Sequence, residues 1–181
     1  MPHIHPLGAQ EDDLDVFRRR KKDGSADNPY EGLRSMALDA VAAGTVAASA
    51  QPAQVLGVIT DVPMSGGSAT VVALADGTTS MYTSTGGGTI GGGGHAHVAA
   101  ATHALLLAAE QQLSAFAGPD DDALPPAGVV RFHVLTASGR LRADVPEAAF
   151  WGKEPHPLVP VIAAEQDVIS ALRTATPADP R

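Results

Sequence analysis

The sequence predicts a single α+β domain in which a long helix rich in alanine and leucine packs on an antiparallel sheet of about five strands. Two hairpin signals favour that sheet: strand-like segments flank Asp76-Gly77 and Ser138-Gly139, and such turns join neighbouring strands that run in opposite directions. Residues 95–117 carry an apolar band wide enough for a core helix. A chain of 181 residues that is 44% hydrophobic can bury a sizeable core of this kind.

The first predicted helix begins in the segment 28–31. Asn28 is a good cap, Pro29 suits the first helical position, and Glu31 can complete a capping box. A helix from this point is amphipathic, and Gly44 is its predicted stop. Its apolar face consists of Tyr30, Leu33, Ala37 and Val41.

Three strands are predicted next, at residues 55–62, 69–75 and 78–84. The second and third form a hairpin around Asp76-Gly77. A two-residue turn at this pair needs positive φ at both positions, and it places Val72 opposite Met81. These three strands supply more than half of the predicted sheet.

A central helix at residues 95–117 follows, and its wide apolar band predicts heavy burial. It ends at Gly118-Pro119, and residues 120–128 form an exposed loop. The last helix of the domain is again amphipathic. Its apolar stripe consists of Leu158, Val161, Ile162, Val168, Ile169 and Leu172.

The second predicted hairpin joins residues 129–136 to residues 140–145 around Ser138-Gly139. Apolar and polar side chains alternate along both strands, so one face is expected to be buried and the other polar, with helices mainly on the buried side. With Ala137 facing Arg140, the polar face carries Arg131, His133, Arg142 and Asp144. This register puts His133 directly across from Asp144.

The predicted organisation is a flexible arm at residues 1–27, a domain at 28–173 and a tail at 174–181. The element order of the domain, α-β-β-β-α-β-β-α, is similar to that of roadblock-type and profilin-like domains, which place helices around a central antiparallel sheet. The resemblance is one of layout and covers residues 28–173. It implies a small scaffolding domain that acts through protein contacts.

Composition narrows the functional classes. The chain has no cysteine, hence no disulfide and no thiolate site, and no apolar run reaches the roughly 20 residues of a membrane span. The N-terminus lacks the basic-then-apolar order of a signal peptide, so a cytoplasmic location is expected, and the arginine, alanine and glycine content suggests a bacterium. The net charge of −8 disfavours nucleic acid. The basic run Arg18–Lys22 is interpreted as solvated arm, with an anionic surface or nucleic acid as the alternative.

A glycine tract between strand and helix is the first candidate site. Gly86, Gly88 and Gly91 form a G-x-G-x-x-G pattern, and an anion could rest on amides at the following helix N-terminus. A dinucleotide site is disfavoured because the preceding strand belongs to a hairpin. The candidate ligand-binding residues are Gly86, Gly88, Gly91, Gly94, His95 and His97. The alternative is a packed or mobile connection.

Histidines give the other candidates. His95 and His97 lack the i, i+4 spacing of helical ligands and have no cysteine or nearby acid to assist, so no metal site and no cofactor is expected. His133 opposite Asp144 could be an oriented general base, but no nucleophile accompanies it, and an ordinary cross-strand polar pair is the alternative.

The sequence therefore favours a non-catalytic protein-interaction or scaffold domain of the bacterial cytoplasm, with a partner protein or a second copy as its target. Trp151 beside Phe150 is interpreted as a plug between the sheet and the last helix, with an exposed recognition patch as the alternative. The competing hypothesis is a protein or enzyme that binds a small anion or phosphate with the loop from Gly86 to His97.

Overall fold

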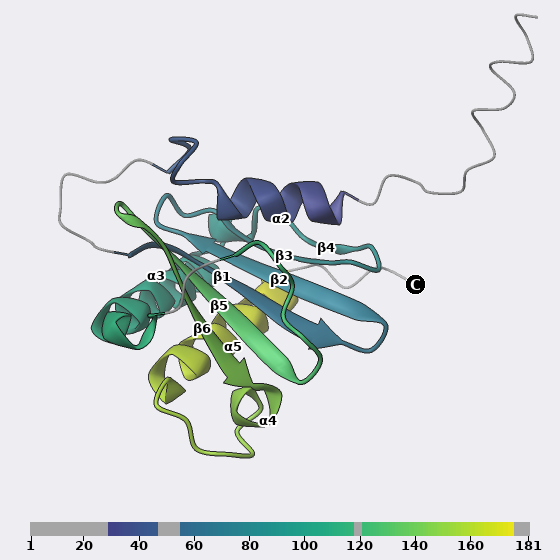
Figure 1. Ribbon diagram of the computed structural model, residues 1–181. Helices are drawn as coiled ribbons and strands as arrows, with labels where there is room; N and C mark the ends of the chain where they lie inside the picture. Colours follow the sequence, from purple (N-terminus) through teal and green to yellow (C-terminus); the bar gives the residue numbers. More distant parts are fainter. Residues whose placement is uncertain (1–28, 47–54, 118–120, 176–181) are drawn as a thin grey trace, which may run out of the picture.

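The structure, a computed structural model, describes residues 29–46, 55–117 and 121–175. These residues form an α+β fold built on one antiparallel sheet of six strands in the order β4-β3-β2-β1-β5-β6 (Figure 1). The predicted class is confirmed, with six strands in place of about five. The predicted arm at 1–27, the cap at Asn28 and most of the predicted tail lie outside the described residues.

The extra strand is β4, which the glycine tract hides in the sequence. The strands are β1 (Val55–Met64), β2 (Gly67–Leu74), β3 (Thr79–Thr83), β4 (Gly88–Thr89), β5 (Val129–Thr136) and β6 (Gly139–Pro146). The helices are α2 (Tyr30–Leu38), α3 (Ala96–Gln111), α4 (Glu147–Phe150) and α5 (Val159–Ala175), with 3-10 turns η1 (Gly92–Gly94) and η2 (Leu113–Ala115).

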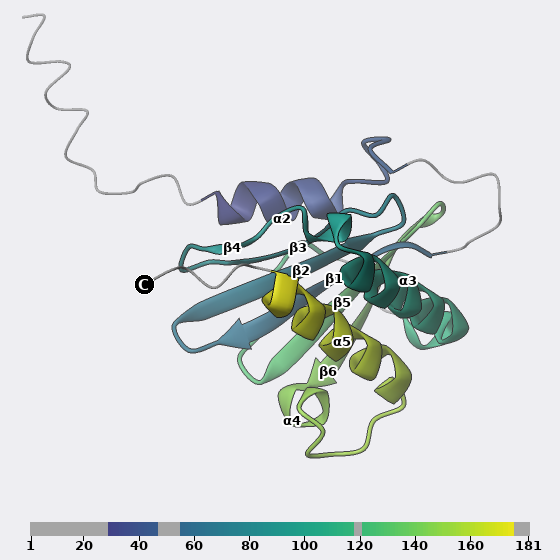
Figure 2. The ribbon, with the colours of Figure 1, turned by 180° about the vertical axis from the view of Figure 1, so that it is seen from behind.

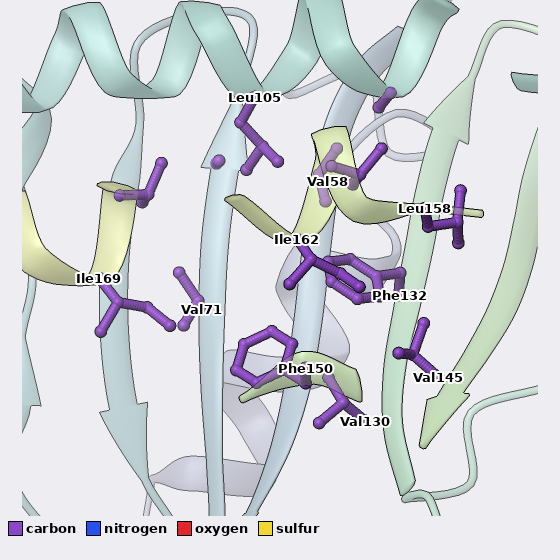
Figure 3. Close-up of a cluster of buried hydrophobic side chains, with 14 of the residues drawn as sticks. Val58, Val71, Leu105, Val130, Phe132, Val145, Phe150, Leu158, Ile162 and Ile169 are labelled. Atoms are coloured by element: carbon purple, nitrogen blue, oxygen red, sulfur yellow. The ribbon is translucent and has the colours of Figure 1, made fainter. Parts of the chain in front are cut away.

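Helices cover both faces of the sheet. The helices α3 and α5 lie side by side on one face (Figure 2), and α2 lies across the other. The larger core is on the α3–α5 side, where Figure 3 shows Val58 and Phe132 of the sheet together with Leu105 of α3 and Ile162 of α5. The smaller core lies under α2, where Ile59 of β1 is fully buried.

The β2–β3 turn differs from the prediction by one residue. Gly77 has φ +92° and no other residue type in the described chain has positive φ, so Asp76 cannot occupy a turn that needs two left-handed residues. The Gly77 amide donates to the Leu74 carbonyl oxygen at 3.0 Å, which gives a three-residue loop. Val72 consequently lies opposite Ser80, and Met81 faces Val71.

In the β5–β6 hairpin, each residue of β5 pairs with a β6 residue two positions earlier in the chain than predicted. The loop is Ala137-Ser138 and Thr136 pairs with Gly139. The Thr136 hydroxyl closes this turn, because it donates to the Gly139 carbonyl oxygen at 2.7 Å and accepts the Ser138 amide at 3.2 Å. The strand faces are as predicted, but the cross-strand partners change.

The central helix α3 is less buried than its sequence predicts. Its inner stripe is Val98, Thr102, Leu105 and Ala109. The opposite side is exposed and carries Ala99, Ala100, His103, Ala104 and Leu107. The reason is the two-helix layer: α3 packs on the sheet and on α5, and in the described chain no further element covers its outer side. The helix ends at Gln111, and Phe116 returns to the core after η2.

Candidate functional site

A buried polar cluster fastens α2 to the sheet. Arg34 of α2 meets Asp61 of β1 through Nη2 to Oδ2 at 2.6 Å and through Nε to Oδ1 at 3.0 Å. The Thr70 hydroxyl donates to Asp61 Oδ1 at 2.7 Å and is itself 2.8 Å from the Tyr30 hydroxyl. His133 Nε2 lies 3.2 Å from Asp61 Oδ2. We call these five residues the α2 clamp.

The charged groups of the α2 clamp are paired with one another inside the protein. Burial by itself would raise the pKa of Asp61, but hydrogen bonds from His133 and Arg34, together with the Arg34 charge, outweigh burial and hold that pKa below its usual range. Asp61 and His133 are both 0% exposed. A group that no solvent or substrate reaches is poorly placed for acid–base chemistry, so the clamp is a structural anchor.

The predicted pair of His133 and Asp144 is not formed as a cross-strand pair. Asp144 lies opposite Arg131, which donates to its two carboxylate oxygens at 2.7 and 2.9 Å, while His133 lies opposite Arg142. The orienting carboxylate of His133 is Asp61, from β1. The sequence offered one signal for this partner, since Asp61 is an acid within an otherwise apolar strand.

The predicted polar outer face of the second hairpin is covered. The segment 121–124 crosses it and is held by arginines: Arg131 Nη1 donates to the Ala123 carbonyl oxygen at 2.8 Å, and Arg142 Nη1 donates to Asp121 Oδ2 at 2.7 Å. Arg34 of the clamp also donates to the Asp122 carbonyl oxygen at 2.6 Å. The segment 121–124 therefore covers the β5 part of this face, where Arg131 is buried, while Asp144 of β6 stays exposed.

The glycine tract divides into two groups that do not share a pocket. Gly86 and Gly88 lie at the β3–β4 hairpin, and Gly88 approaches the Met81 carbonyl oxygen so closely that a Cβ would collide with it. Gly93 is pressed in the same way against the Gly77 carbonyl oxygen. A Cβ would have open space at Gly86, Gly91 and Gly94, so the tract is closely packed at some positions and open at others, and an anion on it stays a prediction.

The other predicted ligand residues lie where α3 begins. The Gly91 amide donates to Ser80 Oγ at 3.3 Å, which directs it toward β3 and away from the helix end. Gly94, His95 and His97 are exposed, and the two imidazole rings have centroids 5.8 Å apart. His97 also lies against α5, with Nε2 3.4 Å from Thr174 Oγ1.

A groove runs along the β4 side of α2, and none of the described residues that line it is charged; we call it the α2 groove. It has two lobes of about 240 and 190 Å³ that share Leu33, Tyr82 and Ile90. The other lining residues are Pro29, Tyr30, Met36, Ala37, Ala40, Thr45, Val72, Leu74, Thr78, Ser80, Thr83 and Gly86–Gly88. Met36 and Ile90 stand on opposite banks and are 72% and 70% exposed.

Tyr82 stands between the two lobes. Its side chain is 6% exposed, and its hydroxyl has no hydrogen-bond partner among the described residues. Burial is the main cause of a raised pKa for this phenol, with the Asp61 charge adding to it. A buried hydroxyl without a partner loses about 1–3 kcal/mol of solvation.

A second groove lies between the α4 end and the first turns of α5, and we call it the Trp151 groove. Its volume is about 650 Å³, and it is lined by Ala149–Pro155, Val159, Ile162, Ala163 and Gln166. Phe150, which is 1% exposed, is the plug between sheet and α5, whereas Trp151 is 44% exposed. The plug predicted at Trp151 is thus wrong, and the exposed patch is the arrangement observed.

In the part of the chain that the structure describes, one carboxyl is buried in the main core. Glu165 of α5 is 0% exposed, and neither its carboxylate oxygens nor the Thr60 hydroxyl on β1 makes a hydrogen bond of standard geometry within the described chain. Burial raises the pKa of Glu165 to about 8, opposed only by the Thr60 hydroxyl. The sequence offered a signal for this residue, because position 165 lies on the apolar stripe of α5, four residues after Val161 and four before Ile169.

Among the residues that the structure describes, no three histidine or acidic side chains are grouped to hold a metal ion. None of the described helices combines the length and apolarity needed to cross a bilayer. Comparisons with protein-family models, with curated proteins and with solved structures found no match. The similarity in element order to roadblock-type and profilin-like domains therefore stays a prediction.

Proposed function

We propose that the protein is a non-catalytic interaction domain that docks a partner protein in the Trp151 groove. The observation that carries this proposal is a tryptophan nearly half exposed at the edge of an apolar groove. Tryptophan is among the side chains most enriched at the energetic centre of protein interfaces. A bacterial, cytoplasmic setting belongs to the same proposal and is supported by composition.

The groove has the anatomy of a protein interface. Its floor is apolar, with Ile162 and half-exposed Val159, and its rim carries Lys153 and Glu154. The wall is held in place, because Gln166 Nε2 donates to the Phe150 carbonyl oxygen at 3.2 Å. A fixed apolar floor inside a charged rim suits an apolar anchor residue of a partner.

The partner is another protein or a second copy of this chain, and light scattering across a concentration series separates the two. Self-association that Trp151→Ala abolishes supports the second copy. The matched control is Leu124→Ala, which removes a side chain of similar exposure, 43%, outside the groove. If the wild-type protein stays monomeric, the groove is tested with peptides selected from a random display library.

Selected peptides support the proposal when they bind the wild type and the Leu124→Ala control and lose at least tenfold in affinity for Trp151→Ala, which is the size of an interface hot spot. The proposal is refuted when the protein neither self-associates nor yields any peptide whose binding depends on Trp151. Far-UV circular dichroism of each variant shows that the fold is retained.

The second candidate is an anion site at the start of α3, and the adjacent exposed rings of His95 and His97 favour it. Titration with inorganic phosphate, followed through the two imidazole resonances, tests it directly. Loss of the response in a His95→Gln, His97→Gln variant supports the site, and no response in the wild type removes it. Alanine at Gly92 or Gly93 is unsuitable, since both positions are packed against other elements.

A further inference from the structure

We propose that the attachment of α5 to the sheet depends on pH: the helix stays in place while the Glu165 carboxyl is neutral, and it detaches more readily once that carboxyl has lost its proton. Two buried polar side chains carry the proposal. Glu165 of α5 and Thr60 of β1 are both 0% exposed, and neither side chain makes a hydrogen bond of standard geometry within the described chain. In contrast to the α2 clamp, this polar contact does not fasten the helix to the sheet.

The surroundings of Glu165 give an ionised carboxylate no partner. Ile162 and Ile169, which precede and follow it on the inner side of α5, lie in the main core (Figure 3). Burial raises the pKa of Glu165 to about 8, and the Thr60 hydroxyl alone opposes this effect, so no charge in the described chain offsets the burial. An unpaired charge inside a protein is strongly unfavourable, and this carboxylate regains its hydration only if it reaches water.

Charged groups on the neighbouring elements lie away from Glu165. Thr60 faces the main core, whereas Asp61 beside it and His133 of β5 belong to the α2 clamp on the other face of the sheet. Arg131 of β5 lies on that other face too. The titratable groups of the two helices beside α5 are His97, His103 and Glu110 of α3, outside its inner stripe, and Glu147 of α4. The proton on Glu165 therefore responds to burial and not to a neighbouring charge.

The element that can move is α5 and not β1. The strand β1 is paired with β2 on one side and with β5 on the other, so displacing Thr60 would break two ladders of backbone hydrogen bonds. The backbone hydrogen bonds of α5 lie within the helix. Its attachment consists of apolar side chains together with bonds such as that from Gln166 Nε2 to the Phe150 carbonyl oxygen. The helix can therefore leave the sheet without breaking a ladder.

The detached state binds the proton more weakly than the attached state. Detachment brings Glu165 into water, where its pKa is near 4.5, whereas the attached helix keeps the proton up to about pH 8. Between these two values the equilibrium constant for detachment is expected to rise about tenfold for each pH unit, because one proton is released with the helix. Below pH 4.5 and above about pH 8 both states have the same protonation, and the constant no longer changes with pH.

Detachment of α5 also takes the Trp151 groove apart, because Val159, Ile162 and Gln166 of this helix line it. This consequence rests on the function proposed for that groove. A partner docked there stabilises the attached helix, since it binds the complete groove and not the open form. The partner and the proton on Glu165 then favour the same state, so the binding of each raises the affinity for the other.

The test uses a single introduced thiol, since the chain has no cysteine. Val168→Cys places this thiol on the buried side of α5, where the native side chain is 0% exposed. The protein is reacted with N-ethylmaleimide at pH 6, 7 and 8. Each rate is divided by the rate of the same protein unfolded in urea at that pH, which corrects for the thiolate fraction and gives the fraction of molecules in which α5 is detached.

The corrected rate of Val168→Cys is expected to rise about tenfold for each pH unit up to about pH 8. Adding Glu165→Gln, which has no proton to lose, is expected to remove the rise. Asp167→Asn is the matched control, because it removes an exposed carboxyl from the same helix and is expected to keep the rise. At pH 8 the detached fraction is expected to be at least about tenfold larger than the globally unfolded fraction, measured by urea denaturation of the same protein.

The proposal is overturned when the corrected rate does not change with pH, when the rise persists with Glu165→Gln, or when Asp167→Asn removes it as well. It is also overturned when the detached and unfolded fractions are equal at every pH, since the whole protein then opens as one unit. Val161→Cys repeats the measurement two turns earlier on α5 if Val168→Cys does not fold. No partner takes part in the labelling, so its outcome is independent of the peptide and self-association tests of the Trp151 groove.

Discussion

Replacing Glu165 by glutamine removes the ionisable group from the main core and keeps its shape. Burial raises the pKa of Glu165 from 4.5 to about 8, so the folded protein holds a proton that the unfolded chain releases between these values. The protonated Glu165 therefore contributes fully to the free energy of unfolding below pH 4.5. This contribution falls as pH rises and is lost above about pH 8. The complete loss corresponds to about 5 kcal/mol, at about 1.4 kcal/mol per pH unit.

Urea denaturation followed by circular dichroism at pH 5, 6, 7 and 8 measures this effect. The unfolding free energy of Glu165→Gln relative to wild type is expected to rise by about 1.4 kcal/mol for each pH unit in this range, reaching about 3–4 kcal/mol at the alkaline end. At pH 5 the two proteins are expected to be close, because both then bury a neutral polar group. Parallel pH curves for the two proteins would refute a buried neutral carboxyl.

Glu154→Gln is the control for that series, since Glu154 is exposed at the rim of the Trp151 groove. Its pH curve is expected to follow the wild type. The comparison between variants also cancels the acid-side loss of stability that comes from Asp61, Asp121 and Asp144, whose pKa values are lowered.

Three further predictions concern the clamp and the glycine tract. Arg34→Met leaves the Asp61 carboxylate buried without its cation and is expected to cost about 3–5 kcal/mol of stability, measured by urea denaturation. The double variant Arg34→Met, Asp61→Asn is expected to recover much of this loss. Equal losses in the two variants would contradict the charge argument. Asp61→Asn alone is expected to flatten the fall in stability below about pH 4, because the carboxylate of Asp61, whose pKa is lowered, stabilises the fold only while it is ionised. Thermal unfolding across pH 2–5 measures this change. Gly93→Ala is expected to lose about 1–3 kcal/mol by collision with the Gly77 carbonyl, and Gly94→Ala, with open space around it, less than about 1 kcal/mol; similar values for both would disprove the packing explanation.

Five of the six strands and the helices α2, α3 and α5 were predictable because each depends on local patterning, whereas β4 and α4 were not predicted. The alternation in β5 and β6 placed every side chain on the correct face, and the stripe of α5 includes the buried residues Val161, Val168 and Leu172. Register was not predictable, because it depends on turn chemistry. The hydrogen bonds of the Thr136 hydroxyl set the position of the β5–β6 turn, and the lack of a positive φ at Asp76 sets that of the β2–β3 turn.

The candidate site was much less predictable than the fold. The clamp needs β1 to pair with β5 and α2 to lie across both, so Arg34, Asp61 and His133 meet only through contacts between distant segments. The α2 groove likewise combines residues 29–45 with residues 72–90. Gly86 and Gly88 were singled out from the sequence for a phosphate, yet they line an uncharged groove.

The α2 clamp has a consequence for how the protein can be redesigned. Hydrophobic contacts alone let a helix slide or roll by small steps at little cost, whereas the paired oxygens of Asp61 accept Arg34 and Thr70 in one alignment. An all-carbon substitute for the clamp could raise the melting temperature, as it does for other interior ion pairs. The same substitute would let α2 shift along the sheet, and the width of the α2 groove would then vary from molecule to molecule.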